Sequence, residues 1–169
     1  MSTRRLTRRI APAFQPVEVE GNLDATGLRI TVVCSRWNPT VTEALLQSAL
    51  GALERHGAKG KDIVVVRVPG AFELAAASGA AIRGGKTDAV VVLGAIVKGE
   101  TPHDRVLGHA VAGALASLSA RTGTPIGFGV LTCDTMDQAR ARTGKGAESA
   151  EAAIQMANLN RLRRRRSRG

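Results

Sequence analysis

The sequence predicts an α/β protein, a three-layer α/β/α sandwich built on a central four-stranded parallel sheet. Short apolar runs typical of buried parallel strands alternate along the chain with segments whose apolar residues have helical spacing. Aromatic residues are scarce, with three Phe, one Trp and no Tyr, so the core must consist of Val, Leu, Ile and Ala. A length of 169 residues predicts one domain with a substantial core.

Four apolar segments are the predicted strands: Leu28–Ser35, Ile63–Val68, Ala89–Ile96 and Ile126–Leu131. Val17–Glu20 alternates apolar and acidic residues and is a candidate for an N-terminal edge strand. A predicted helix follows each of the four strands. This order predicts a parallel sheet with helices on both faces, in a flavodoxin-like arrangement.

Helix boundaries are marked by local signals. Thr40 and Glu43 have the spacing of a capping box, and His56 followed by Gly57 is a typical helix end. Thr135 and Gln138 form a second capping box. The remaining helices are expected at Leu74–Ile82, at about 104–121, and from Ala147 to about Leu162.

The net charge of +10 is concentrated at the two ends of the chain. Residues 1–9 contain four arginines and residues 161–169 contain six, and neither segment contains an acid. Without these ten, 14 basic residues balance 14 acidic ones. We therefore expect a disordered basic tail at 1–13, one domain at 14–160 and an arginine-rich tail at 161–169. The balance argues against a nucleic-acid-binding face on the domain itself.

Cys34 and Cys133 lie far apart and have no histidine pair at metal-ligand spacing, so we expect buried free thiols and no metal. No apolar stretch is long enough to span a bilayer, which predicts no membrane association. There is no secretory segment, and the expected location is the cytoplasm. The arginine-rich first 14 residues leave an organellar transit peptide as the alternative.

The segment Gly94–His103 (GAIVKGETPH) carries the most chemical information. It leaves the carboxyl end of a predicted strand and enters a helix, where unpaired backbone N–H groups can hold an anion. A histidine beside a bound anion, His103, is a candidate for proton transfer. An ordinary strand–helix loop is the alternative. Loops 36–39, 69–73 and 132–135 should meet it, because ligands bind beyond the carboxyl ends of parallel strands.

Taken together, these loops resemble those of the lumazine synthase family of riboflavin biosynthesis. The resemblance runs from about Leu28 to Leu159 in order and spacing. Its matching pieces are Arg36–Asn38 (RWN), Val68–Glu73 (VPGAFE), Gly94–His103, Phe128–Thr132 (FGVLT), Gln138–Arg142 (QARAR) and Lys145-Gly146. The resemblance implies a transferase that condenses 5-amino-6-(D-ribitylamino)uracil with 3,4-dihydroxy-2-butanone 4-phosphate. Phosphate and water are released, and neither a metal nor an organic cofactor takes part.

The resemblance also assigns roles to residues. His103 would be the general acid/base, and Trp37 would stack on the pyrimidine, with a core position as its alternative. Phe128 would lie near the ketone-phosphate pocket, again with a core position as a strong alternative. The remaining substrate contacts would come from Ala71, Phe72 and Glu73 toward the ribityl chain and from the main chain of Ala95, Ile96 and Val97. Phosphate would be held by Gly99, Glu100, Thr101 and Arg142, with Lys145 as a further candidate.

The chain departs from the family pattern at three points. Asp104, Arg105 and Val106 follow the histidine where relatives commonly have an aromatic, an acid and an aromatic. Ala71 stands where a serine is usual. The turn between Arg142 and Lys145 is shorter than the family norm. Within the family, the resemblance implies a homo-oligomer of pentamers with sites between subunits, and the short turn favours a 60-subunit icosahedral shell.

Three alternatives follow from these features. The arginine tail could capture RNA or acidic cargo, or it could be a solvated tail that aids solubility. The protein could be a shell-forming polyanion-binding scaffold with weakened catalysis. It could also be a pyrimidine-binding paralogue such as an archaeal-type riboflavin synthase, although the phosphate loop argues against that reading. His109 is expected to be structural.

Overall fold

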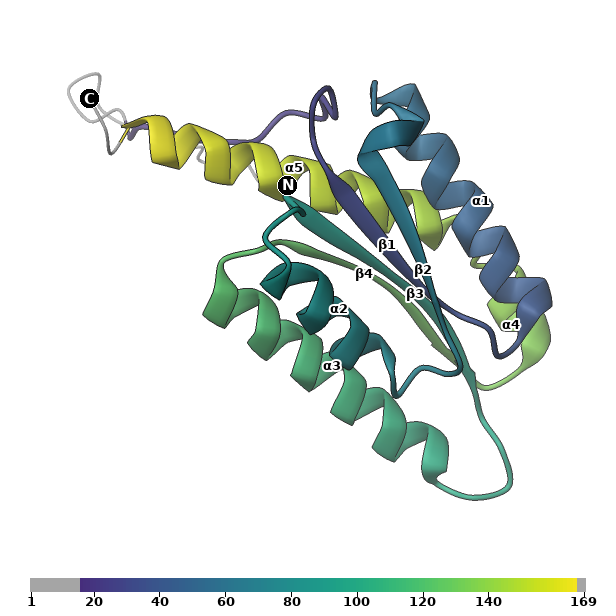
Figure 1. The fold of residues 1–169 in the computed structure, drawn as a ribbon. Helices are drawn as coiled ribbons and strands as arrows, with labels where there is room; N and C mark the ends of the chain where they lie inside the picture. The colour runs from purple at the N-terminus through teal and green to yellow at the C-terminus, as the bar shows by residue number, and fades with distance from the viewer. Residues whose placement is uncertain (1–15, 167–169) are drawn as a thin grey trace, which may run out of the picture.

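The computed structural model describes residues 16–166 and consists of a four-stranded parallel sheet between two layers of helices (Figure 1). The strands are β1 (Ile30–Ser35), β2 (Ile63–Val68), β3 (Ala89–Val97) and β4 (Ile126–Cys133). The helices are α1 (Pro39–Arg55), α2 (Leu74–Arg83), α3 (His103–Thr122), α4 (Met136–Arg140) and α5 (Lys145–Arg166), with a 3₁₀ turn at Gly60–Asp62. The predicted fold class is confirmed.

The strand order is β2-β1-β3-β4. The chain adds β2 on one side of β1, then crosses to the other side, where β3 pairs with β1 and β4 pairs with β3. α2 and α3 pack on one face of the sheet, and α1, α4 and α5 cover the other (Figure 1). The point at which the strand order reverses lies between β1 and β3. In sheets of this kind the crevice at that point, outside the carboxyl ends of the strands, is where ligands bind.

Aliphatic side chains fill both interfaces between sheet and helices. Val32, Val91 and Leu93 point toward α1 and α5, whereas Val33 and Val92 point toward α2 and α3, as the alternation of strand side chains requires. Cys34 and Cys133 are buried free thiols, as predicted. Within the described residues, no helix has the length and hydropathy needed to cross a membrane.

The predicted N-terminal edge strand does not form. Residues 16–20 have no regular secondary structure, and Val17 is largely exposed. The segment leads onto α5 instead of a sheet edge, because Gln155 donates to Glu20 at 2.9 Å and the backbone of Gly21 lies against the Gln155 carbonyl. The expectation of disorder at 1–13 lies outside the described residues.

The first predicted capping box is also wrong. α1 begins at Pro39 with Asn38 as its N-cap, so Thr40 already belongs to the first turn. Glu43 binds Arg67 on β2 and makes no capping contact. The second capping box is confirmed, since the N–H of Gln138 donates to the Thr135 hydroxyl at 3.2 Å.

The last helix is longer than predicted at both ends, running from Lys145 to Arg166. The predicted arginine tail therefore begins as ordered helix through Arg166. Arginine has a high helix propensity, and the preceding turns are fixed by packing, so the helix continues into the arginine run.

β2 and β4 are the two edges of the sheet. Val64 and Val65 on β2 are exposed, as is Phe128 on β4. Within the described residues, both edges therefore present apolar side chains and unpaired strand backbone to the surroundings.

Candidate functional site

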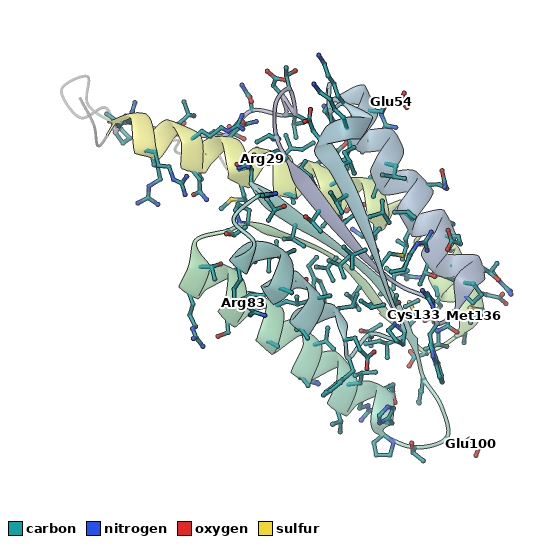
Figure 2. The ribbon with its side chains drawn as sticks, viewed as in Figure 1. Arg29, Glu54, Arg83, Glu100, Cys133 and Met136 are labelled. Atoms are coloured by element: carbon teal, nitrogen blue, oxygen red, sulfur yellow. The ribbon has the colours of Figure 1, made fainter. Side chains whose placement is uncertain are left out.

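A pocket of about 480 Å³ lies at the carboxyl edge of the sheet, over the crevice between β1 and β3. Figure 2 shows the orientation: Glu100, Cys133 and Met136 are labelled toward this end of the molecule, and Arg29 lies toward the other. The predicted loop 132–135 does not line the pocket. Predicted site residues from three loops, the end of β3 and the start of α3 do line it: Trp37, Ala71, Phe72, Glu73, Ala95, Ile96, Val97, Gly99, Thr101 and His103.

Two aromatic rings stand at the pocket and are open to solvent. Trp37 is 72% exposed and Phe72 is 71% exposed, so neither ring belongs to the core of this chain. The N–H of Arg36 donates to the Val68 carbonyl at 2.9 Å, and the N–H of Trp37 donates to the Pro69 carbonyl at 3.2 Å. These bonds fix the loop after β1 against the loop after β2. They leave the Trp37 ring available to a planar ligand.

Asn38 joins the two central strands across the crevice. Its backbone is left-handed, with φ 57° and ψ 56°, and it is the one non-glycine residue with positive φ in the described part of the chain. Its side-chain amide donates to the Ala95 carbonyl at 2.9 Å. Asn tolerates this conformation better than most residues. Sequence reasoning missed it as a pocket residue, although Asn before Pro at a strand end was a usable signal.

The loop after β2 is held by its own glutamate. Glu73 accepts a hydrogen bond from the Gly70 N–H at 2.9 Å, while Ala71 is buried beneath the loop. The Glu73 carboxylate therefore shapes the loop as well as lining the pocket. Pro69 and Gly70, which also line it, were within the predicted motif without a separate role.

Gly94 allows β3 to pass closely between its neighbours. A Cβ there would lie 3.1 Å from a Leu74 methyl and 3.3 Å from the Ser35 hydroxyl oxygen. The following residues, Ala95, Ile96 and Val97, continue the strand to the pocket. Their side chains alternate between the two faces of the sheet, and those of Ala95 and Ile96 are buried.

The loop between β3 and α3 presents free backbone donors at residues 99–101, a segment called the anion loop below. Within residues 16–166, the N–H groups of Gly99, Glu100 and Thr101 make no hydrogen bond to a protein acceptor. α3 begins at His103 without a side-chain cap and runs for 20 residues. Its first-turn donors and the positive end of its dipole face the same region, which favours an anion.

His103 is exposed at the first position of α3 and lines the pocket. Asp104 lines it as well, yet the two side chains form no ion pair in the described structure. The His103 imidazole is thus open to a ligand. His109 lies further along α3, where Nδ1 is 2.7 Å from the Arg105 carbonyl oxygen, and it does not line the pocket.

Four predicted residues do not line this pocket. Glu100 is in the anion loop but outside the lining, and Phe128 contributes to a groove between β4 and α3. Arg142 donates to the Gln138 carbonyl at 3.0 Å, and Lys145 pairs with Glu148. Phe128 is 48% exposed, so a core position does not describe it. The pocket of one chain therefore contains the exposed rings of Trp37 and Phe72 (the ring platform), His103 and the anion loop. It does not contain Arg142.

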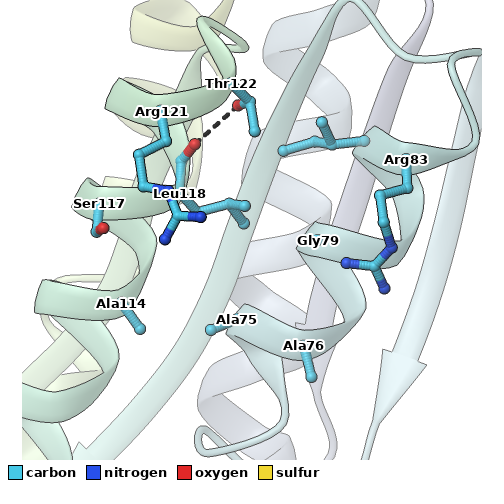
Figure 3. Close-up of a pocket in the computed structure, with 10 residues that line it drawn as sticks. Ala75, Ala76, Gly79, Arg83, Ala114, Ser117, Leu118, Arg121 and Thr122 are labelled. Atoms are coloured by element: carbon cyan, nitrogen blue, oxygen red, sulfur yellow. Dashed lines mark hydrogen bonds between the residues drawn. The ribbon is translucent and has the colours of Figure 1, made fainter.

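A larger groove of about 710 Å³ lies between α2 and α3 (Figure 3). Small residues such as Ala75, Gly79 and Ala114 line it, with Arg83 and Arg121 among them. Thr122 donates to the Leu118 carbonyl at 2.7 Å beside it. None of the predicted site residues lies in this groove, so we assign it no part in the chemistry.

Cys34 and Glu43 do not line the pocket and are held by contacts within the fold. Burial raises the pKa of the Cys34 thiol to about 11, so this thiol is protonated at neutral pH. A hydrogen bond from Arg67 lowers the pKa of Glu43 below its ordinary value. Within the described residues no group of three or more His, Cys, Asp or Glu side chains could hold a metal ion.

A parallel sheet with a pocket at its carboxyl edge, lined by backbone donors, exposed aromatic rings and a histidine, places this chain in the doubly wound α/β class, whose ligands bind at that edge. The family model for 6,7-dimethyl-8-ribityllumazine synthase matches residues 27–161. The chain belongs to that family, whose members are transferases of riboflavin biosynthesis.

Two curated relatives share about half of their residues with this chain. The 6,7-dimethyl-8-ribityllumazine synthase of Salinibacter ruber is 49% identical over 150 residues, which cover 85% of this chain and 96% of the relative. The enzyme of the same name from an Anaeromyxobacter species is 47% identical over 148 residues, covering 84% and 90% respectively. Similarity thus extends over nearly the whole length of each relative.

Proposed function

We propose that this chain forms 6,7-dimethyl-8-ribityllumazine from 5-amino-6-(D-ribitylamino)uracil and 3,4-dihydroxy-2-butanone 4-phosphate. The amine attacks the ketone and water leaves to form an imine, the imine then loses a proton and phosphate, and ring closure by the second amine on the remaining carbonyl releases a second water. The observation that carries this function is the single pocket that combines Trp37, the free N–H groups of Gly99–Thr101 and His103. Its three parts match an aromatic ring, a phosphate and a proton transfer.

The roles follow from position. The Trp37 ring stacks on the pyrimidine, whose edge meets the main chain of Ala95–Val97, and the ribityl chain lies against Ala71, Phe72 and Glu73. Gly99, Glu100 and Thr101 hold the phosphate with backbone donors. His103 moves protons at the reacting carbonyl and amine, where general acid–base catalysis is effective.

Much of the rate comes from bringing two substrates together. Aligned reactants can gain effective molarities of about 10⁵ M or more. The reaction needs no electron transfer, and the imine forms from substrate groups alone, so the proposed roles are binding, orientation and proton transfer. The two free buried thiols, Cys34 and Cys133, fit the reducing cytoplasm as its location.

We further propose that the working form is a homo-oligomer with each site completed by a neighbouring chain. Phe128, Arg142 and Lys145 lie outside the pocket of their own chain, and the exposed rings of Trp37 and Phe72 leave it open on one side. An arginine from the neighbour would add a bidentate partner for the phosphate. A ring of five chains satisfies a head-to-tail contact of this kind, and twelve such rings would form a shell.

The function is tested by His103→Ala, with His109→Ala as the matched control on the same helix. We expect the first variant to turn over about 10²-fold more slowly, because an acid–base group is lost. The control should keep its rate, since its imidazole contacts its own helix. The readout is lumazine fluorescence under saturating amounts of both substrates.

Two results would contradict the proposal. Product formation by the intact, assembled protein at no more than the uncatalysed rate would favour the scaffold with weakened catalysis. Equal losses in both histidine variants would show that α3 tolerates no substitution, and would remove the special role of His103.

A further inference from the structure

The carboxyl end of α5 is a cationic helix. From residue 152 to residue 169 the sequence contains six arginines and no acidic residue. The structure continues the helix through Arg166, so five of these arginines belong to one helical segment from Arg161 onward. Figure 1 shows this segment projecting past the end of the sheet.

Residues 158–161, called the root of this segment below, are fixed to the domain by hydrogen bonds. Asn158 donates to the carbonyls of Asn22 and Asp24 at 3.1 and 2.7 Å, and Asn160 donates to the Gly123 carbonyl at 2.8 Å. Arg161 donates to the Gly27 carbonyl at 2.9 Å and pairs with Asp88 at 3.5 Å. The helix is therefore presented at a set angle from a rigid base.

Beyond the root, Arg163 and Arg166 are exposed, and within residues 16–166 neither forms an ion pair with an acid. Cations near a helix carboxyl end are stabilised by the dipole, but the effect is confined to the last turn. Adjacent arginines repel one another at i, i+3 spacing. A bound polyanion would reduce the repulsion between these arginines.

The residue types select a phosphate backbone as the partner. Guanidinium groups bind phosphate with paired hydrogen bonds. After Asn160, Leu162 is the one apolar residue of the sequence. The segment from Arg161 onward therefore has no apolar face of the kind that inserts into a membrane surface. It also lacks the aromatic anchors that make the central contacts of most protein interfaces.

We propose that Arg163 and Arg166 bind the phosphate backbone of nucleic acid without base preference. Their two guanidinium groups lie three residues apart on one face of the helix, and binding releases counterions from the nucleic acid. The surface lies at the opposite end of the strands from the pocket, since its root contacts Gly27, Asp88 and Gly123, each of which precedes a strand. Nucleic acid and substrates therefore do not compete.

The test uses the full chain, with a fluorescent 20-nucleotide single-stranded RNA of mixed sequence as the probe. We compare the double variant R163Q/R166Q with R163K/R166K and with the control K59Q/K61Q, which removes two exposed charges elsewhere. Fluorescence anisotropy gives Kd at several salt concentrations. Lumazine turnover is measured in parallel on every variant.

We expect R163Q/R166Q to weaken RNA binding about tenfold or more at low salt. The slope of log K against log salt should fall by about 1.4 per chain, since each single-strand phosphate contact contributes about 0.7. The lysine variant and the control should keep the slope. Turnover should be the same in all four proteins, so a failure of this proposal leaves the enzymatic function untouched.

Three outcomes would overturn the proposal. The first is an unchanged slope in the glutamine variant. The second is tighter binding of a polyglutamate peptide than of RNA, which would make acidic protein the partner. The third is tighter binding of vesicles containing phosphatidylserine, which would make the segment a membrane contact.

Discussion

Asn38 shows how one side chain sets the geometry of the pocket. Its left-handed backbone turns the chain from β1 into α1, and its amide reaches the Ala95 carbonyl on β3. Strained backbone of this kind persists only where the surrounding structure holds it, and it clusters at functional sites. The residue positions Trp37 on one side and the end of β3 on the other.

Replacing Asn38 should separate its two contributions. Asn38→Ala loses the hydrogen bond and places a less tolerant residue at positive φ, so the free energy of unfolding should fall by about 1–3 kcal/mol. Asn38→Gly keeps the backbone tolerance and should lose less. Urea denaturation measures both. Equal losses would mean that the backbone conformation costs nothing here.

Prediction from sequence succeeded at residues whose type and local spacing favour a single structural role. Cys34 and Cys133 are buried and free, and the Thr135 cap forms as expected. It failed at Thr40, because α1 begins at Pro39 with its N-cap at Asn38, two residues before the predicted cap, and because Glu43 pairs with Arg67 instead. Such long-range competition is not visible in local spacing.

At the scale of elements, α5 is fitted to the domain through backbone contacts that only glycine permits. A Cβ on Gly127 of β4 would lie 1.9 Å from the Ser149 carbonyl oxygen, and one on Gly146 would lie 2.1 Å from the Leu45 carbonyl oxygen. The Ala147 N–H also donates to the Ser48 hydroxyl at 3.1 Å. The helix is thereby held to both β4 and α1 near its start.

Gly127→Ala should destabilise the fold by about 3 kcal/mol, because the new methyl group meets backbone that cannot move aside easily. Gly51→Ala in α1 is the control, since the one neighbour within 4 Å of its Cβ is the flexible Arg55 guanidinium. This second change should add about 0.5–1 kcal/mol of helix stability. Thermal unfolding followed by circular dichroism measures both. A tolerated Gly127→Ala would contradict the close approach.

Element order was predictable, because alternating strand and helix patterns allow few topologies. The end of α5 was not, since an arginine run reads equally well as solvated tail or as helix. What decides is the bonding of Asn158, Asn160 and Arg161 to loops far away in sequence. Val17–Glu20 misled for the same reason: its alternation fits a strand, but the segment leads onto α5.

At the scale of the whole molecule, the pocket of one chain lacks part of the predicted site. The ring platform, the anion loop and His103 lie together, whereas Phe128 and Arg142 lie elsewhere. The resemblance to the family assigns all of these residues to one site. The structure divides them into residues that line the pocket of their own chain and residues that do not. That separation is what motivates a site shared between chains.

Mixed oligomers test the shared site directly. His103→Ala and Arg142→Ala should each be impaired alone. Chains of both kinds, co-assembled in equal amounts, should recover about a quarter of the normal activity, because that fraction of interfaces has both residues intact. Activity is measured after refolding the two variants together. Recovery no greater than the mean of the two separate proteins would place both residues in one chain's site.

The two open sheet edges have a consequence for the life of a newly made chain. Exposed strand backbone beside Val64 and Val65 can pair with any other strand it meets, productive or not. In the oligomer proposed above, a chain that has not yet met its neighbours is therefore exposed to incorrect strand pairing and to proteolysis. If the proposed oligomer forms, assembly soon after synthesis would cover these edges and leave few single chains.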